Sequence, residues 1–215
     1  MNKTKTLTIL AMLSAFAYIV MVVGRIPVVL FLKYDPKDVI ITIGGFLLGP
    51  LAAFTISLLV SIVEMFTVSD TGFIGLIMNV ISTCSFACTA AFIYKHNKTL
   101  KGAIIGLISG GLLTTGVMLL WNYIITPIYL GYPREAVAKM LVPAFLPFNL
   151  LKGSLNAALT MLLYKPLVNS LRKSNLYTTS TQSGAKQKIN IGVMLVSFLV
   201  LITSILLVLV LNGTI

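Results

Sequence analysis

Four polar residues recur at helical spacing in an apolar stretch of the chain. They stand three, four and four positions apart, which places on one helical face the residues Asn149, Lys152, Asn156 and Thr160. Amides donate and accept hydrogen bonds, and a lysine ammonium donates to a carbonyl. Such a face suits a planar, polar ligand that carries little charge. Asparagines also tie membrane helices together, so a purely structural role is the alternative.

Charged residues inside apolar segments are candidates for function. Lys152 and Glu64 are the two that lie well inside such segments, where a charge costs about 2.5 to 3.5 kcal/mol unless it is compensated. Lys152 is therefore expected either to contact a ligand or to form a structural ion pair with Glu64 or Asp35.

Further amides and aromatic rings occur near the ends of apolar segments. Asn122 stands between Trp121 and Tyr123, and Asn79 lies in the preceding apolar segment. The rings could stack on a cyclic ligand, or they could belong to the aromatic belt at the membrane interface. The amides, the ammonium group and the rings together predict a cavity that faces the outside.

No sequence pattern predicts catalysis. The chain has no GxxxxGK[ST] loop, so it is not expected to hydrolyse ATP by itself, and it has no HExxH motif. The single histidine, His96, lies in a basic connector, so a serine nucleophile has no histidine partner. Cys84 and Cys88 are interpreted as packing residues rather than metal ligands. We therefore expect neither an enzyme nor a bound metal or cofactor.

Composition predicts the elements that must position these residues. Of the 215 residues, 58% are hydrophobic and 10% are charged, whereas a soluble domain carries about 25% charged residues. Since a helical crossing needs roughly 20 residues, the chain can form about six or seven spans and no soluble domain. The fold class expected is an all-α membrane protein.

The expected apolar helices are separated by glycine, proline and charged residues. They cover residues 7–23, 39–48, 51–68, 73–94, 102–129, 140–167 and 189–211. Three glycines four positions apart, Gly102, Gly106 and Gly110, predict close packing of one helix against a neighbour. The domain organisation expected is a membrane domain over 1–173, a polar cytoplasmic linker over 174–188 and an additional transmembrane helix over 189–211.

The net charge of +11 is explained by membrane topology rather than by a nucleic-acid partner. When connectors are assigned alternately to the two sides, one side receives only basic residues: Lys3, Lys5, Lys95, Lys98, Lys101, Lys165, Arg172, Lys173, Lys186 and Lys188. The other side also receives acidic residues, among them Asp35, Asp38 and Asp70. The basic side is expected to be the cytoplasm, which places the N-terminus inside and the C-terminus outside.

Residues 1 to about 173 resemble the substrate-binding S components of energy-coupling factor (ECF) vitamin transporters, in particular the riboflavin-binding branch. The motif Pro147-Phe148-Asn149-Leu150-Leu151-Lys152-Gly153 is the most specific part of the resemblance. The other parts are Ala11-Met-Leu-Ser-Ala15, Lys33-Tyr34-Asp35, Phe46-Leu-Leu-Gly49-Pro50, and Asn122-Tyr123 with Pro127 and Tyr129.

The resemblance implies a bundle of six helices in a bacterial plasma membrane, with a vitamin site near the outer face. Riboflavin would be a transported ligand rather than a cofactor. Asn122, Asn149 and Lys152 would bind the flavin ring, and Tyr34, in the loop after the first helix, would help to enclose it. The full candidate set is Asn149, Lys152, Asn122, Tyr34, Asn79, Trp121, Glu64 and Asp35.

The resemblance also implies partners that supply the energy for uptake. A membrane coupling subunit would dock on Ala11 and Ala15, and two cytoplasmic ATPases would drive toppling of the S component in the membrane. The alternative in another class is a secondary carrier that works alone, but such folds usually contain inverted repeats, and none is found here.

Two features depart from the family pattern. The helix over 189–211 is additional to the usual six. The loop KYDPKD is highly charged for a riboflavin binder, and Glu64 occupies a position that is neutral or basic in that branch. A different small vitamin is therefore a second alternative.

Overall fold

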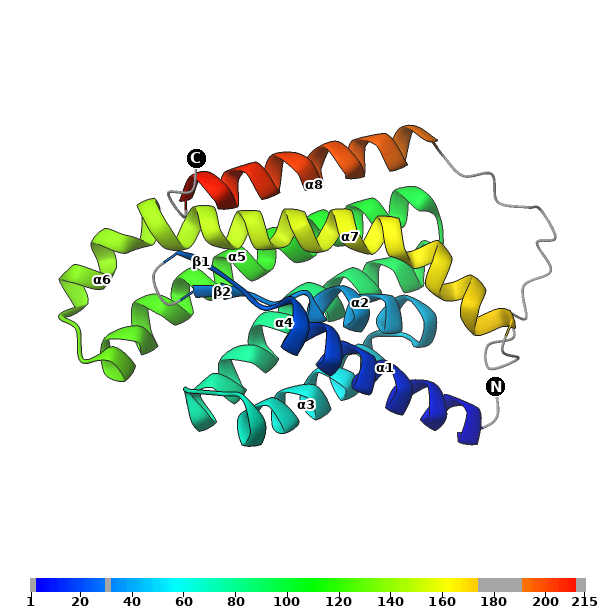
Figure 1. The fold of residues 1–215 in the computed structure, drawn as a ribbon, viewed down its shortest axis with the longest axis horizontal. Coiled ribbons are helices and arrows are strands. Elements are labelled where there is room, and N and C mark those ends of the chain that lie inside the picture. The colour runs from blue at the N-terminus through cyan, green and yellow to red at the C-terminus, as the bar shows by residue number, and fades with distance from the viewer. Residues whose placement is uncertain (1–2, 30–31, 174–190, 212–215) are drawn as a thin grey trace.

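The computed structural model describes residues 3–29, 32–173 and 191–211, and it consists of helices and one short hairpin (Figure 1). The helices are α1 (Lys3–Gly24), α2 (Lys37–Leu48), α3 (Pro50–Thr67), α4 (Gly72–His96), α5 (Leu100–Leu130), α6 (Arg134–Met140), α7 (Leu146–Lys173) and α8 (Ile191–Leu211). Strands β1 (Ile26–Val29) and β2 (Leu32–Tyr34) join α1 to α2, and a π-helical turn (Leu141–Phe145) joins α6 to α7.

The helices have the length and apolarity of membrane spans. In the described residues, five stretches qualify by length and composition: α1, α3, α4, α5, and the stretch from Arg134 to Ser170 that contains α6 and α7. The described part of α8 is apolar as well. The predicted all-α membrane class is confirmed.

Helix α2 is short and lies inside the bundle. Its 12 residues rise only about 18 Å, too little to cross a bilayer. It contacts α1, α3, α4 and α7, and every residue from Lys37 to Phe46 is buried. It ends at Leu48. The next residue, Gly49, has a φ of +98°, which suits glycine, and Pro50 then begins α3. The first residues of α2 therefore lie in the interior, although the sequence assigned Lys37 and Asp38 to an outer loop.

The predicted glycine face packs against α4. A Cβ atom on Gly106 would lie 2.8 Å from the carbonyl oxygen of Ala90, and one on Gly110 would lie 2.6 Å from that of Phe86. Helices α5 and α7 also approach closely, since a Cβ on Gly153 would lie 3.2 Å from the Cα of Gly111. These contacts fix the positions of the polar faces of α5 and α7 within the bundle.

Two connectors differ from the sequence-based expectation. The stretch between α1 and α2, expected to be a loop, forms an antiparallel hairpin in which Ile26 pairs with Tyr34. The hairpin packs on α7, and a stretch this short gave no periodic signal of its own. The connector before α7 is largely helical, because Arg134–Met140 form α6, so the helical stretch begins before the expected residue 140.

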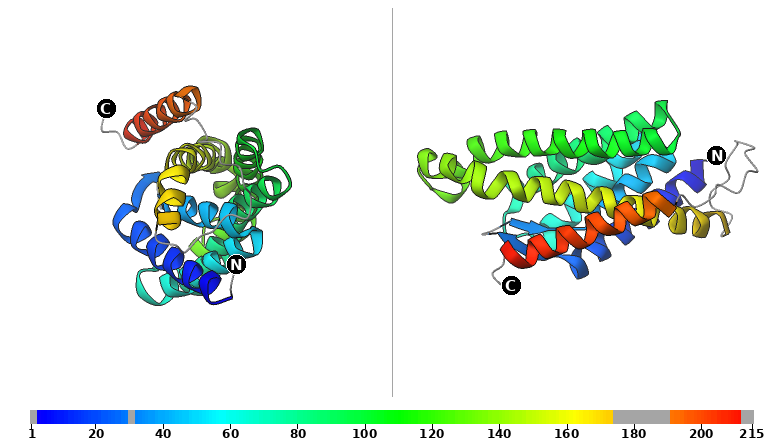
Figure 2. Two further views of the ribbon diagram at one scale, coloured as in Figure 1. Left: turned by 90° about the vertical axis from the view of Figure 1, so that its right-hand side faces the viewer. Right: turned by 90° about the horizontal axis from the view of Figure 1, so that it is seen from above.

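Helix α8 lies alongside α7, as both views in Figure 2 show. It begins at Ile191, close to the expected start, whereas the predicted linker over 174–188 lies outside the described residues. A cavity of about 490 Å³ separates α8 from α5 and α7, and its lining is mostly apolar, with residues such as Leu107, Ala157 and Val196. The lining residues that the structure describes carry no charge, so this cavity offers few groups that could bind a polar ligand.

Candidate functional site

The polar face of α7 meets a carboxylate at the start of α2. Lys152 Nζ lies 3.1 Å from Asp38 Oδ2 and 3.3 Å from the hydroxyl of Ser82. The other carboxylate oxygen of Asp38 accepts a hydrogen bond of 2.7 Å from the Thr83 hydroxyl. Asp38 is buried, with 1% of its surface exposed. The structure thus corrects the expected ion pair of Lys152, whose partner is Asp38 rather than Glu64 or Asp35.

A hydrogen-bonded chain connects this carboxylate to the hairpin. Asn156 Nδ2 donates to Asp38 Oδ2 over 3.3 Å, and Asn156 Oδ1 accepts a bond of 2.9 Å from the Tyr34 hydroxyl. Burial raises the pKa of the Tyr34 phenol, and the charges of Asp38 and Asp35 raise it further, so Tyr34 remains a donor at neutral pH. We call the residues Tyr34, Asp38, Ser82, Thr83, Lys152 and Asn156 the Asp38 cluster.

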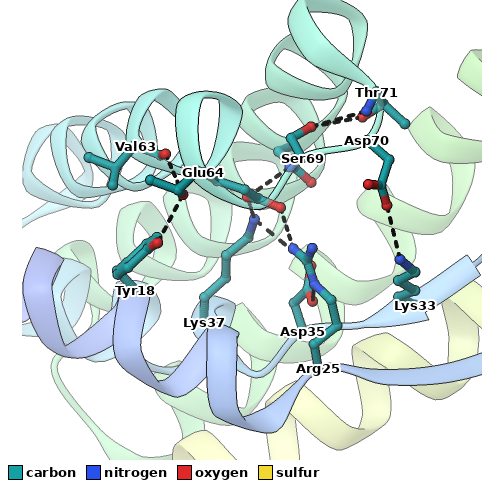
Figure 3. A network of polar contacts seen from close by, with 12 residues as sticks. Tyr18, Arg25, Lys33, Asp35, Lys37, Val63, Glu64, Ser69, Asp70 and Thr71 are labelled. Carbon is teal, nitrogen blue, oxygen red and sulfur yellow. Dashed lines mark hydrogen bonds and ion pairs between the residues drawn. The ribbon is translucent and has the colours of Figure 1, made fainter.

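A second group of charges surrounds Glu64, as Figure 3 shows. Arg25 and Lys37 both form ion pairs with this carboxylate, and Asn79 Nδ2 donates to it over 2.9 Å. Arg25 also binds Asp35, with Nε 2.7 Å from Oδ1. We call Arg25, Asp35, Lys37, Glu64 and Asn79 the Glu64 cluster. Its members come from the two ends of the hairpin and from α2, α3 and α4.

The charges of the two clusters balance. Three cations, Arg25, Lys37 and Lys152, face three carboxylates, and Lys37 and Asp38 are neighbours in the sequence that point into different clusters. Burial lowers the pKa of Arg25, but its hydrogen bond and attraction to Asp35, together with the charge of Glu64, outweigh this and raise it. Arg25 therefore stays charged.

The unusual charge of the KYDPKD segment is accounted for by these pairs. Each of its charged residues has a partner: Lys33 with Asp70 at 3.4 Å, Asp35 with Arg25, Lys37 with Glu64 and Asp38 with Lys152. Figure 3 shows that the Lys33 and Asp70 pair lies apart from the Glu64 cluster, and the two side chains are 45% and 83% exposed. These pairs attach β2 to the connector between α3 and α4 through Lys33, and they attach the start of α2 to α3 through Lys37 and to α7 through Asp38.

The apolar side of the hairpin covers α7. Val28 and Tyr34 are buried against Phe148, Leu151 and Leu155, which flank the polar face of that helix. Tyr34, predicted to help enclose a ligand, therefore lies over α7 and inside the Asp38 cluster.

The two remaining candidate amides are buried but bonded within their own helices. Asn149 Nδ2 donates to the carbonyl of Phe145 over 2.7 Å, in the π-helical turn that precedes α7. Asn122 Nδ2 donates to Met118 over 2.7 Å and accepts a bond from Thr126. No hydrogen bond in the described part of the chain joins either amide to the Asp38 cluster.

The levels of these amides along the bundle follow from the contact between Gly111 and Gly153. Since α5 and α7 run in opposite directions, Asn149 lies about 6 Å beyond that contact and Asn122 about 16 Å beyond it, toward the hairpin end of the bundle. Trp121 is half-buried beside Asn122. The structure therefore brings Lys152, Asn156 and Tyr34 together and places Asn149 and Asn122 at successively more distant levels.

Sequence reasoning missed the partners of the candidate residues. The sequence predicts that Asp38, Lys37 and Arg25 lie on the outer side, between the first two apolar segments, and Thr83 is not among the predicted site residues. One signal could have pointed to Asp38 and Lys37: the apolar segment that follows them, residues 39–48, is too short to span the membrane, so at least one of its ends must lie inside the bundle.

The predicted docking residues lie on the outer surface of α1. Ala11 and Ala15 are exposed, whereas Leu13 and Ala17 are buried on the opposite face. Met12, Phe16 and Ile19 add large exposed apolar side chains to this helix. The exposure is what a docking surface requires, and the role itself remains a prediction.

Comparisons with known proteins place this arrangement in context. Residues 5–164 match the family described as "ECF transporter, substrate-specific component". The riboflavin transporter RibU of Staphylococcus aureus is 29% identical over 183 residues, which are 80% of this chain and 95% of that protein. RibU of Streptococcus thermophilus is 30% identical over 185 residues, 80% of this chain and 87% of the relative. The riboflavin transporter FmnP of Bacillus subtilis is 26% identical over 191 residues, 81% of this chain and 100% of the relative.

A solved structure, an S component of a bacterial ECF transporter, has a similar fold. Its TM-score is 0.66 with 29% sequence identity, over 80% of this chain and 99% of that chain. The family match ends at residue 164, inside α7, so α8 lies beyond it.

Proposed function

Since this chain belongs to the family of substrate-specific components of ECF transporters, we propose that it is the subunit that binds riboflavin for uptake. The proposal is supported by three relatives that are riboflavin transporters and that each align with about 80% of this chain. The observation that carries it in the structure is Lys152, a cation on a buried polar face that the β1–β2 hairpin flanks.

The donors and acceptors of this region suit an isoalloxazine ring. Lys152 has three N–H donors, and in the described residues two of them are used by Asp38 and Ser82, which leaves one for a ligand carbonyl. Asn149 and Asn122 would exchange their bonds within the helix for bonds to the ring edge. Their separation of about 10 Å along the bundle suits an elongated, planar ligand.

Orientation and partners form part of the proposal. The N-terminus, the connection between α4 and α5, and the end of α7 lie at one end of the bundle, and the hairpin and α6 lie toward the other (Figure 1). The first end carries the basic residues Lys3, Lys5, Lys95, Lys98, Lys101 and Lys173, and this basic character supports a cytoplasmic position for that end in a bacterium. The exposed α1 face with Ala11 and Ala15 would dock on a membrane coupling subunit that works with two ATPases.

Riboflavin binding can be measured directly. The protein, purified in detergent and stripped of bound flavin, should quench the fluorescence of added riboflavin in a saturable titration. A Lys152→Met variant should bind about 10 to 100 times more weakly, since a hydrogen bond to a charged group contributes about 1.5 to 3 kcal/mol. Lys101→Met removes an exposed lysine from the cytoplasmic end of α5 and serves as the matched control, with unchanged affinity.

The outcomes separate the alternatives. A folded wild-type protein that does not bind riboflavin would exclude the riboflavin assignment while leaving the family membership intact, and mass spectrometry of co-purified small molecules would then identify another vitamin. Uptake into liposomes by this chain alone would instead favour a secondary carrier.

A further inference from the structure

The Asp38 cluster connects the hairpin to the lysine that we assign to riboflavin. Tyr34 of β2 donates to Asn156 over 2.9 Å, and Asn156 donates to Asp38 over 3.3 Å. The same oxygen, Asp38 Oδ2, lies 3.1 Å from Lys152 Nζ. Two donors from one helix face thus share one acceptor, and a shift of Asn156 changes the position that Lys152 can take.

The side chains that form this series of hydrogen bonds have little freedom to move. Tyr34, Asp38 and Asn156 have 5%, 1% and 1% of their surface exposed, and Asp38 is held on its other oxygen by Thr83 at 2.7 Å. Bonds in a buried network polarise and orient one another, so the loss of one bond affects the others. Asp38 in turn fixes the ammonium group, because a lysine side chain has four flexible bonds and no preferred direction of its own.

We propose that Asp38 is the positioning residue for Lys152, and that Tyr34 acts on the same lysine through Asn156, so that the hairpin and Lys152 contribute cooperatively to ligand binding. The inference rests on the proposed function, since it assumes that Lys152 contacts riboflavin. Tyr34 then strengthens binding without touching the ligand.

The test is a double-mutant cycle read out as riboflavin affinity and dissociation rate. Tyr34→Phe removes only the hydroxyl and should raise the Kd about 3- to 10-fold, as expected for one neutral hydrogen bond. Asn156→Leu keeps a side chain of similar size and removes both hydrogen bonds, the one from Tyr34 and the one to Asp38. Its Kd should rise at least as much, and Tyr34→Phe in the Asn156→Leu background should have no further effect.

A matched control separates positioning from general destabilisation. Tyr94→Phe removes the hydroxyl that contacts Tyr164 at 3.2 Å, on helices α4 and α7 but outside the Asp38 cluster. It should leave the Kd unchanged, even if it lowers the melting temperature as much as Tyr34→Phe does. If Asn156→Leu does not fold, Lys152→Arg takes its place, because the arginine keeps the charge but alters the geometry at Asp38.

The results lead to distinct conclusions. An unchanged Kd for Tyr34→Phe, or effects of Tyr34→Phe and Asn156→Leu that multiply, would overturn the coupling while leaving riboflavin binding by the wild type intact. A wild-type protein without riboflavin affinity would refute the proposed function itself, and the coupling with it. An effect of Tyr34→Phe that disappears in the second background supports the coupling.

Discussion

The Glu64 cluster allows a sharp test of the idea that buried charges attach the hairpin to the bundle. Glu64→Gln leaves Arg25 and Lys37 with a single carboxylate, Asp35, which lies 3.9 Å from Lys37. The side chains of Lys37 and Glu64 are 1% and 4% exposed, so water cannot replace the lost partner. Removing one member of a buried ion pair typically costs about 3 to 5 kcal/mol. Lys37→Met should lower the free energy of unfolding by a similar amount, because Arg25 is then the only cation of the cluster that faces the carboxylates of Asp35 and Glu64.

The loss of unfolding free energy in the double variant should be smaller than the sum of the losses in the two single variants. With both Glu64→Gln and Lys37→Met, the cluster retains the neutral pair of Arg25 and Asp35, which are 2.7 Å apart. Replacing both partners of a buried pair is often close to neutral. The free energies of unfolding should therefore show a coupling of about 3 kcal/mol or more between the two positions.

Scanning calorimetry in detergent measures these effects. For a chain of this size each single variant should lower the melting temperature on the order of 6 to 20 °C, and the double variant should recover most of the loss. Lys33→Met is the matched control, since both side chains of its pair with Asp70 are exposed to solvent and such pairs contribute little. The reasoning would be refuted if the decreases in melting temperature of the two single variants simply added in the double variant. It would also be refuted if Lys33→Met lowered the melting temperature as much as either of them.

Three further predictions concern packing, domain organisation and pH. Gly110→Val should lower the melting temperature, because any Cβ there would lie 2.6 Å from the Phe86 carbonyl oxygen, whereas Gly116→Val on the same helix has no atom within 4 Å and should not. A chain that ends at residue 173 should fold and bind riboflavin with unchanged affinity in the same fluorescence titration, because the family match ends at residue 164; loss of binding would show that α8 supports the site. The raised pKa of Tyr34 adds stability below its usual value of about 10, which is lost as pH rises through its higher folded-state pKa. In unfolding measurements above pH 10, Tyr34→Phe should therefore lose less stability with rising pH than the wild type.

The hydrophilic face of α7 could be predicted from the sequence because it depends on helical spacing alone. Asn149, Asn156 and Thr160 are all buried, as expected of a face that avoids lipid. The glycine face of α5 could be predicted for the same reason, since residues four apart must share a side of the helix. The helix that carries Asn122 was also located, but the side chain's bonds to Met118 and Thr126 were not foreseeable from its spacing.

Pairing between distant residues could not be predicted in this way. Lys152 and Asp38 are 114 positions apart, and either of the carboxylates Glu64 and Asp35 was an equally reasonable partner before the helices were placed. The position of α2 decided the question, because that short helix packs among α1, α3, α4 and α7 and its first residues, Lys37 and Asp38, are buried.

Sequence alone determined that this chain lies in a membrane, where its apolar helices fall, and which residues on α7 avoid lipid, since hydropathy and helical periodicity are local properties. Only the tertiary structure decided which charged residues form ion pairs with one another. The low dielectric of the interior makes each buried charge require a nearby partner, but several partners satisfy that requirement equally well until packing brings one of them within about 3 Å. In this protein, that packing joins Tyr34, Asn156, Asp38 and Lys152 into one connected site.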